Sequence, residues 1–425
     1  METRTYSEFN QTVYETTLEN GLRVRLIPMT GFHKTYAMLT TDFGAVDRSL
    51  PDGQPIPAGM AHFLEHKLFE KADHDAFDLF GALGADANAF TAFTQTSYLY
   101  STTGHFKENL DVLLDFVQTP YFTDQTVQKE IGIISQEIRM YNDNPDSRLY
   151  MGMLGNLYPH DPLADDIAGT EESLQKITPE LLYAAHAAYY QPEYLTLQLA
   201  GNLDPEETLQ WIKDNQAQKA FKAPTGKAIT FEVADPTGKD ILPYRHLTMP
   251  VSRPKVIVGL RGVQSTTDPR VRLKRQLAIS LMLELLFDDT GRHYQDLYNR
   301  GIIDDSFSFN FESNRGFNFA LFATETEQQA AFRDAISQLV ENASVELAAV
   351  KDQFMMLKNG ILGRLVGALD SPETVVNRFA TRDMGSLTIF DEIRTLKALT
   401  WEEVEAVAKD FMEPERLTVY EIDAN

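Results

Sequence analysis

An internal repeat limits this chain to folds that can be built twice. Residues 177–180, Ile-Thr-Pro-Glu, lead through a helical stretch to Pro-Glu-Tyr-Leu-Thr at 192–196, and residues 399–402, Leu-Thr-Trp-Glu, lead likewise to Pro-Glu-Arg-Leu-Thr at 414–418. Threonine and proline are 14 residues apart in both copies, and the copies are offset by 222 residues. Each copy continues into an apolar segment typical of a strand. The repeat predicts two related halves, although a helix followed by a strand is also common in unrelated segments.

The boundary between the halves is expected in a polar, turn-rich segment. Residues 219–239 contain Ala-Pro-Thr-Gly and Asp-Pro-Thr-Gly, and segments rich in proline and glycine form turns and linkers. We therefore expect an N-terminal domain over 1–220, a linker over 221–240 and a related C-terminal domain over 241–425. A chain of 425 residues is long enough for two cores of this size.

The first half mixes strands and helices without regular alternation. Apolar and β-branched runs predict strands over 12–17, 23–28, 36–43 and within 88–100, and helical spacing predicts helices over 58–70, 74–83, 106–119 and 125–141. A doubly wound parallel sheet requires strand and helix to alternate. We therefore expect an α+β fold in which each domain has an antiparallel sheet packed with helices. Met355 and Met356 are expected in the core.

Cysteine usage and charge exclude several functions. Because the sequence has no cysteine, disulfides and thiolate metal sites are excluded, and histidine and carboxylates are the metal ligands that remain. A net charge of -24 argues against nucleic acid and membranes as partners. No apolar signal core and no membrane-length apolar run occur, which predicts a cytoplasmic protein. The acidity either keeps the protein soluble or partly lines a site for basic ligands.

The segment His62-Phe-Leu-Glu65-His66 carries the strongest chemical signal. On a helix, residues three and four apart lie on one face, so His62, Glu65 and His66 would point the same way. Two imidazoles one turn apart can hold a single zinc ion, while the carboxylate between them acts as general base on zinc-bound water. The pattern predicts one Zn2+ per chain, with His62 and His66 as ligands and Glu65 as the catalytic residue.

A third ligand is predicted on a second helix, at residues 125–141. Its stripe of Glu130, Ile133, Ile134, Glu137 and Tyr141 has the spacing of a core-facing surface, yet it carries two carboxylates. A buried carboxylate is costly unless it is paired or bound to a metal. We therefore expect Glu137 to be the third ligand. Glu130 is expected to support the site by contacting one of the ligands and not the metal itself.

Both patterns have plainer interpretations. The two histidines could be solvated on a polar helix face, and the glutamates could form a solvated seam between apolar stripes. The remaining histidines show no second metal spacing and are expected to be surface or satisfied polar residues: His33, His74, His105, His160, His186, His246 and His293.

Taken together, these patterns resemble a known family. The motif, the 71-residue step from His66 to Glu137 and the position of Glu130 seven residues before Glu137 are similar to the inverzincin zinc metallopeptidases of the pitrilysin, insulysin and mitochondrial processing peptidase family. Residues 84–98 resemble that family's Gly-x-x-x-Asn-Ala-aromatic-Thr stretch. Residues 116–124 and 167–170 resemble its bacterial half-length branch, and in it the YmfH-like proteins. The similarity is specific over residues 60–200 and looser to the end.

The resemblance implies how substrate would bind. Two related domains would form one half of a clamshell peptidase that closes around unfolded peptides. Residues 88–91 would be an edge strand to which substrate adds as a further strand, so that Asn88, Ala89 and Phe90 contact it. From the residues alone, Asn88 could also be a turn residue before an ordinary strand.

A departure from the family pattern bears on partners. Many relatives carry an Arg-x-x-Gly-x-x-Tyr-like element in the second domain that helps to hold the substrate carbonyl, and here Tyr298 and Asp304 occupy those places. We therefore expect a heterodimer with a related partner chain that lacks the zinc motif, or else a homodimer.

These observations predict a zinc metalloendopeptidase or processing peptidase that hydrolyses short unfolded peptides. One alternative is a non-catalytic peptide-binding or core subunit of the same fold, against which the intact set of motif residues argues. Another is a sugar hydrolase that uses two carboxylates, for which nothing places two particular acidic residues opposite each other.

Overall fold

The computed structural model describes residues 1–263 and 266–424, which form two compact units. The first unit comprises Met1–Ile138, Asp166–Ile229 and Gly367–Phe390, and the second comprises Arg139–Asp165, Thr230–Val366 and residues 391–424. The chain passes between the units inside the expected linker, but residues 139–165 and 367–390 also cross over. The two units group residues by their contacts and not by the sequence repeat, so they do not test the expected consecutive domains. The domains 1–220 and 241–425 stay a prediction.

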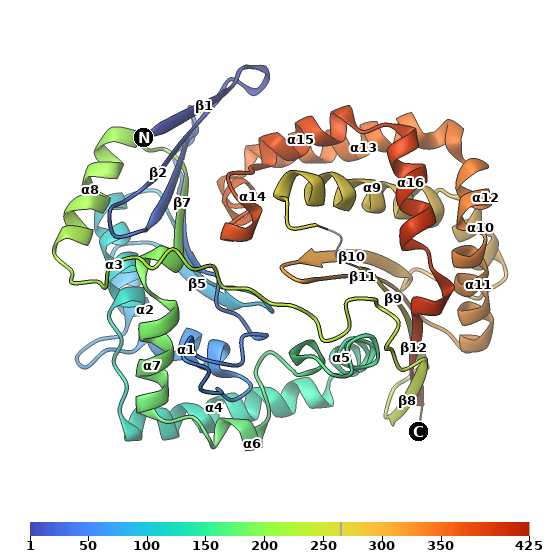
Figure 1. Cartoon of the computed structure of the whole chain (residues 1–425), viewed down its shortest axis with the longest axis horizontal. Coiled ribbons are helices and arrows are strands. Elements are labelled where there is room, and N and C mark those ends of the chain that lie inside the picture. Colours follow the sequence, from blue (N-terminus) through green and yellow to red (C-terminus); the bar gives the residue numbers. More distant parts are fainter. Residues whose placement is uncertain (264–265, 425) are drawn as a thin grey trace. The chain divides into compact units, whose positions relative to one another are not determined.

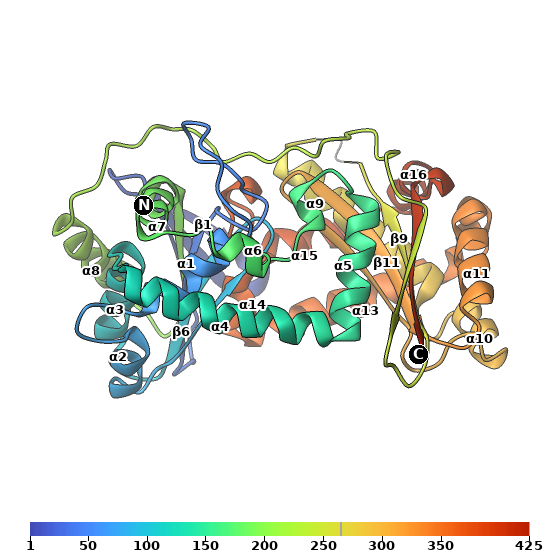
Figure 2. The same ribbon diagram turned by 90° about the horizontal axis from the view of Figure 1, so that it is seen from below.

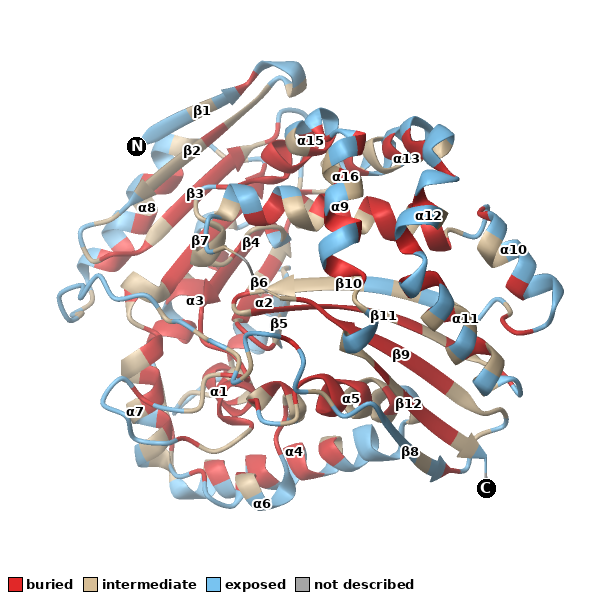
Figure 3. Cartoon of the chain, turned by 45° about the vertical axis from the view of Figure 1, so that its right-hand side comes forward, coloured by how far each residue is buried: buried red, intermediate tan, exposed pale blue. Residues whose placement is uncertain are grey.

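The first unit is built on a seven-stranded sheet in the order β1-β2-β3-β7-β4-β6-β5 (Figure 1). Strands β3 and β7 are parallel, and the other neighbours are antiparallel. The central strands β4 and β7 are buried along their whole length (Figure 3), whereas β5 is an edge strand that, among the described residues, pairs with β6 alone. The strands are β1 (Glu2–Tyr6), β2 (Gln11–Thr17), β3 (Arg23–Pro28), β4 (Thr35–Thr41), β5 (Asp86–Thr91), β6 (Thr96–Thr102) and β7 (Leu195–Gly201).

Helices cover both faces of this sheet. Ala37 and Leu39 of β4 belong to the core formed with α1 (Met60–Phe69) and α3 (Phe106–Gln118). Tyr36, whose side chain points to the opposite face, donates a hydrogen bond of 2.8 Å to Asn377 of α14 (Pro372–Asn377). A segment from late in the sequence therefore completes the first unit. The other helices here are α2 (Ala76–Ala82), α4 (Asp124–Asp143), α6 (Glu171–Leu174), α7 (Pro179–Tyr189) and α8 (Pro205–Ala217).

The second unit has a five-stranded sheet in the order β10-β11-β9-β12-β8. Its strands are β8 (Tyr244–Met249), β9 (Lys255–Arg261), β10 (Ser308–Asn314), β11 (Phe317–Glu325) and β12 (Leu417–Ala424). Its helices are α5 (Pro145–Leu157), α9 (Pro269–Phe287), α10 (Arg292–Asn299), α11 (Gln329–Glu341), α12 (Ala343–Ala348), α13 (Phe354–Gly367), α15 (Ile389–Ala398) and α16 (Trp401–Phe411). Strands β8 and β12 are parallel and β10 is an edge strand.

The two sheets share one topology, which agrees with the duplication. The order β5-β6-β4-β7-β3 in the first unit corresponds strand for strand to β10-β11-β9-β12-β8 in the second, and both end in a parallel pair. The repeated segments form α7 with β7 and α16 with β12. The predicted α+β class is confirmed, but the sheets are not wholly antiparallel.

Two further expectations from the sequence can be compared with the structure: the burial of two methionines and the lack of a membrane-spanning segment. Met355 and Met356 are 55% and 60% exposed, so their assignment to the core is wrong: α13 buries Phe354, Lys358 and Leu365 on another face. Among the described residues, no helix has both the length and the apolar character needed to cross a bilayer.

Candidate metal centre

Helix α1 holds the three motif residues on one face. It begins after Gly59, which has a left-handed φ of 86°. A Cβ at this position would lie 2.4 Å from the carbonyl oxygen of Ala168, so only glycine fits this close approach. The rest of the helix anchors it, because Phe63, Leu64 and Leu68 are fully buried. The local sequence thus fixes both the start and the rotation of the helix.

Gly59→Ala is expected to lower the free energy of unfolding by at least about 1–2 kcal/mol, because the new methyl group meets backbone and the left-handed conformation is strained. Urea unfolding measures this. Gly132→Ala is the matched control: Gly132 lies inside α4 with open space around it, and alanine there should raise stability by up to about 1 kcal/mol. Equal stabilities for the two variants would contradict the assigned start of α1.

Helix α4 brings two carboxylates to the motif. Figures 1 and 2 both show α4 beside α1. One oxygen of Glu137 lies 3.6 Å from Nε2 of His62 and the other lies 3.6 Å from Nε2 of His66. One ligand atom from each of the three residues can be chosen so that all lie within 4.8 Å of one another. Within residues 1–263 and 266–424, this is the one such group of histidine and carboxylate side chains.

Glu130 contacts the site from the far side of His66. Its Oε1 lies 3.0 Å from Nδ1 of His66, and the side chain is buried. Since a carboxylate only accepts hydrogen bonds, Nδ1 carries the hydrogen and donates it. In the neutral form of His66, the lone pair is then on Nε2, the nitrogen that faces Glu137. Both predicted glutamates are therefore adjacent to the motif.

The environment sets the charge of each group. Burial, with the nearby His66, lowers the pKa of His62 to about 3, so this imidazole is neutral at neutral pH. Burial also opposes the charged form of His66, but the hydrogen bond and charge of Glu130, aided by Glu65 and Glu137, raise its pKa above the usual value. Burial raises the pKa of Glu65, and Thr91 and His66 partly offset this rise.

The donor set fits a zinc ion. Two histidine nitrogens and one carboxylate are ligands that zinc takes in hydrolytic sites, where three protein ligands leave one position open. Nδ1 of His62 is buried and has no hydrogen-bond partner in the described part of the chain. The other ring nitrogen, Nε2, faces Glu137 at 3.6 Å, which is too far for a hydrogen bond, and this is the nitrogen that a metal ion would occupy.

Some expectations for α4 and β5 need correction or detail. Ile133 and Tyr141 are 45% and 37% exposed. The prediction that they lie on the buried face together with Glu130 is therefore wrong. Asn88 and Phe90 are exposed and Ala89 is half-buried on β5, and β5 stands at the end of the strand order, as expected for an edge strand. The side-chain oxygen of Asn88 accepts a 2.8 Å hydrogen bond from the N–H of Ala89.

One residue of the site was missed. Thr91, the last residue of β5, donates a 2.5 Å hydrogen bond to Oε2 of Glu65. The Asn-Ala-aromatic-Thr stretch of residues 88–91 ends in this threonine, so the sequence did indicate a hydroxyl here. No spacing rule relates it to Glu65, however, because the two residues belong to different elements.

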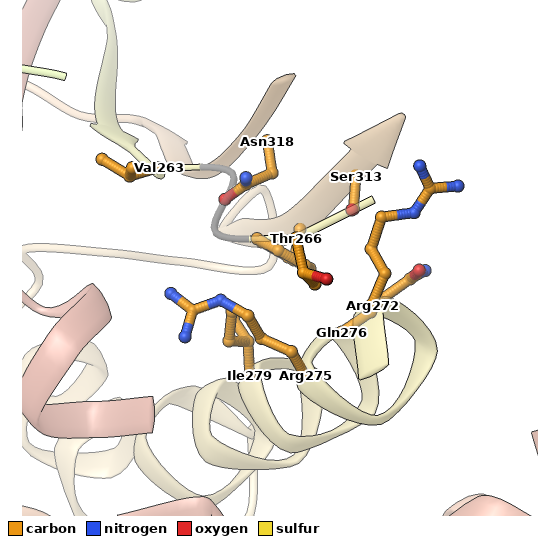
Figure 4. A pocket seen from close by; sticks show the side chains of 9 residues that line it. Val263, Thr266, Arg272, Arg275, Gln276, Ile279, Ser313 and Asn318 are labelled. Carbon is orange, nitrogen blue, oxygen red and sulfur yellow. The ribbon is translucent and has the colours of Figure 1, made fainter. Parts of the chain in front are cut away.

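Within the part of the second unit that the structure describes, these ligands are lacking at the corresponding place. Helix α9 follows β9 as α1 follows β4, and a pocket lies between α9 and the strands β10 and β11 (Figure 4). Arg275, which lines it, pairs with Asp410. The nine lining residues include neither histidine nor carboxylate: Val263, Thr266, Arg272, Arg275, Gln276, Ile279, Phe311, Ser313 and Asn318.

Fold and site together define a duplicated α+β protein whose first unit brings two histidines and a carboxylate close enough to share a metal ion. Comparisons with known proteins agree. The profile described as "Insulinase (Peptidase family M16)" matches residues 53–171, and that described as "Peptidase M16 inactive domain" matches residues 176–354. The chain belongs to peptidase family M16.

Individual relatives span the whole chain. "Uncharacterized zinc protease YmfH" of Bacillus subtilis (strain 168) is 39% identical over 98% of both chains. A crystal structure from Alicyclobacillus acidocaldarius, described as M16-like, is 32% identical, covers 98% of this chain and 99% of its own, and superposes with a TM-score of 0.91. A structure of the M16 inactive domain from Pseudomonas fluorescens shares the fold, with a TM-score of 0.80 and 17% identity over 97% and 98% of the chains.

Proposed function

We propose that this protein is a zinc-dependent endopeptidase or processing peptidase that hydrolyses short unfolded peptides. The proposal rests on one observation: Glu137 of α4 lies close to His62 and His66 of α1. The same face of α1 also presents Glu65. The names of the relatives, zinc proteases of family M16, support the same reaction class. A cytoplasmic location stays a prediction from the sequence.

The chain's own residues have distinct roles in this proposal. His62, His66 and Glu137 would hold one zinc ion, and Glu130 would orient His66. When bound, zinc supplies Lewis-acid chemistry that polarises a peptide carbonyl and makes water more acidic. Glu65 would take the proton of the attacking water and deliver it to the leaving amine, because a buried carboxylate with a raised pKa can serve both steps.

Strand β5 would bind the substrate. Its outer edge is unpaired, and an unpaired edge can add a peptide through main-chain hydrogen bonds whatever the side chains are. Such binding suits unfolded peptides of varied sequence. Asn88, Ala89 and Phe90 would contact the added strand, and the N–H of Ala89 would exchange its bond with Asn88 for one with the substrate.

A partner chain is part of the proposal. Asp304 accepts hydrogen bonds from Ser306 and, at 2.6 Å, from Arg253, and these contacts lower its pKa to about 2. An ionised carboxylate cannot donate to a substrate carbonyl, so Asp304 cannot replace the tyrosine of the relatives. We infer that a related chain without the zinc motif supplies these donors in a heterodimer closed around the peptide; a homodimer would lack them.

One experiment tests both statements. The full chain, alone and mixed with a candidate partner chain, is incubated with a mixture of unfolded synthetic peptides, and products are followed by mass spectrometry with and without a chelator. Zinc-dependent cleavage that the partner accelerates is expected. Equal cleavage by the lone chain would contradict the need for a partner. Bound zinc or peptide without any cleavage would favour the non-catalytic subunit instead.

A further inference from the structure

Thr91 links the edge strand to the base. The side chains of β5 alternate in exposure: Asn88 and Phe90 are exposed, whereas Ala89 and Thr91 are half-buried on the side that packs with α1. From this side, the hydroxyl of Thr91 reaches Oε2 of Glu65 at 2.5 Å. A carboxylate bonded by a hydroxyl at this distance is held in one place.

The neighbours of Thr91 leave its hydrogen for Glu65. Thr96 stands opposite Thr91 in the β5–β6 ladder and is fully buried. Its hydroxyl donates to the carbonyl oxygen of Phe43 at 3.0 Å and lies 3.4 Å from the hydroxyl of Thr91. Each hydroxyl has a single hydrogen, so Thr96 has none left for Thr91, and Thr91 gives its own to Glu65. The β-branched side chain also restricts the rotation of this donor.

We propose that Thr91 is a positioning residue that fixes the carboxylate of Glu65 for proton transfer. The bond holds Oε2 on the side of Thr91 and leaves Oε1 free to take the proton from water. A glutamate has three rotatable side-chain bonds, and misplacing a reacting group by about 1 Å can cost about 100-fold in rate. The inference rests on the proposed function. It adds that the strand expected to bind substrate also sets the position of the base.

Two variants separate the hydroxyl from the shape of the side chain. Thr91→Val keeps the β-branched shape and removes the donor, whereas Thr91→Ser keeps the donor. In the full-length protein with its partner, Thr91→Val is expected to lower kcat roughly 10- to 100-fold on an unfolded peptide while KM and bound zinc stay unchanged. Thr91→Ser should restore most of the turnover. Ser313→Ala, which removes a hydroxyl from the edge strand β10 of the second unit, should leave turnover unchanged.

Crystal structures of the variants give a readout that does not depend on activity. The Glu65 carboxylate should keep its position in Thr91→Ser and be displaced in Thr91→Val. Unchanged turnover in Thr91→Val, loss of zinc in that variant, or failure of Thr91→Ser to restore turnover would overturn the inference. If the unmodified protein cleaves no peptide, the proposed function fails. The crystal structures then still decide, since an undisplaced Glu65 in Thr91→Val would by itself overturn the positioning role.

Discussion

Glu65→Gln is expected to slow peptide cleavage at least about 100-fold while zinc stays bound. Glutamine has the same shape, and its side-chain oxygen can still accept the hydrogen bond of Thr91, but the amide cannot take a proton from water. Since a general base contributes about 100- to 10,000-fold to the rate, kcat should fall by this factor. Peptide cleavage is followed by mass spectrometry, and zinc content by elemental analysis.

A second carboxylate variant controls for the change in charge. Glu172 lies on α6 of the same unit, and its side chain is 85% exposed and paired with Lys176. Glu172→Gln should therefore keep full activity. Turnover retained in Glu65→Gln would show that another group is the base, whereas joint loss of turnover and zinc would mean that Glu65 supports metal binding. Only the separation of the two readouts supports the proposed role.

The part of the site within one helix could be predicted from sequence because helical spacing is local. His62, Glu65 and His66 needed nothing beyond a periodicity of three and four residues. Glu137 and Glu130 were predicted because carboxylates at core spacing require a partner. The same reasoning failed for Ile133 and Tyr141, since spacing tells which residues share a face but not which neighbours cover it. Their exposure follows from the packing of other elements.

Contacts between distant elements could not be predicted in this way. The repeat predicted two related halves, and the shared strand order agrees with it. Nothing local in residues 367–390 indicated that they belong to the first unit, where Arg382 of this segment donates to the carbonyl oxygens of Gly21 and Leu195. The bond from Thr91 to Glu65 was missed for the same reason. Both depend on how strands are ordered in the sheet.

His62→Ala is expected to remove bound zinc and with it all activity. Two ligands, His66 and Glu137, would remain, fewer than the three that zinc hydrolases use.

His62 is also the ligand that needs no deprotonation, because its pKa of about 3 keeps it neutral at neutral pH. His66 binds zinc only as the neutral imidazole, and its raised pKa favours the protonated form more than in an ordinary histidine. Zinc should therefore dissociate progressively as the pH falls and His66 becomes protonated.

Elemental analysis after dialysis against metal-free buffer measures the zinc, and thermal unfolding with and without added zinc gives an independent readout, because a bound ligand stabilises the folded state. His33→Ala is the control, since His33 is an exposed histidine of the same unit, and it should keep zinc and the thermal shift. A His62→Ala protein that retains one zinc would contradict the ligand set. Loss of zinc in His62→Ala and its retention in Glu65→Gln would together separate the residues that hold the metal from the residue that moves the proton.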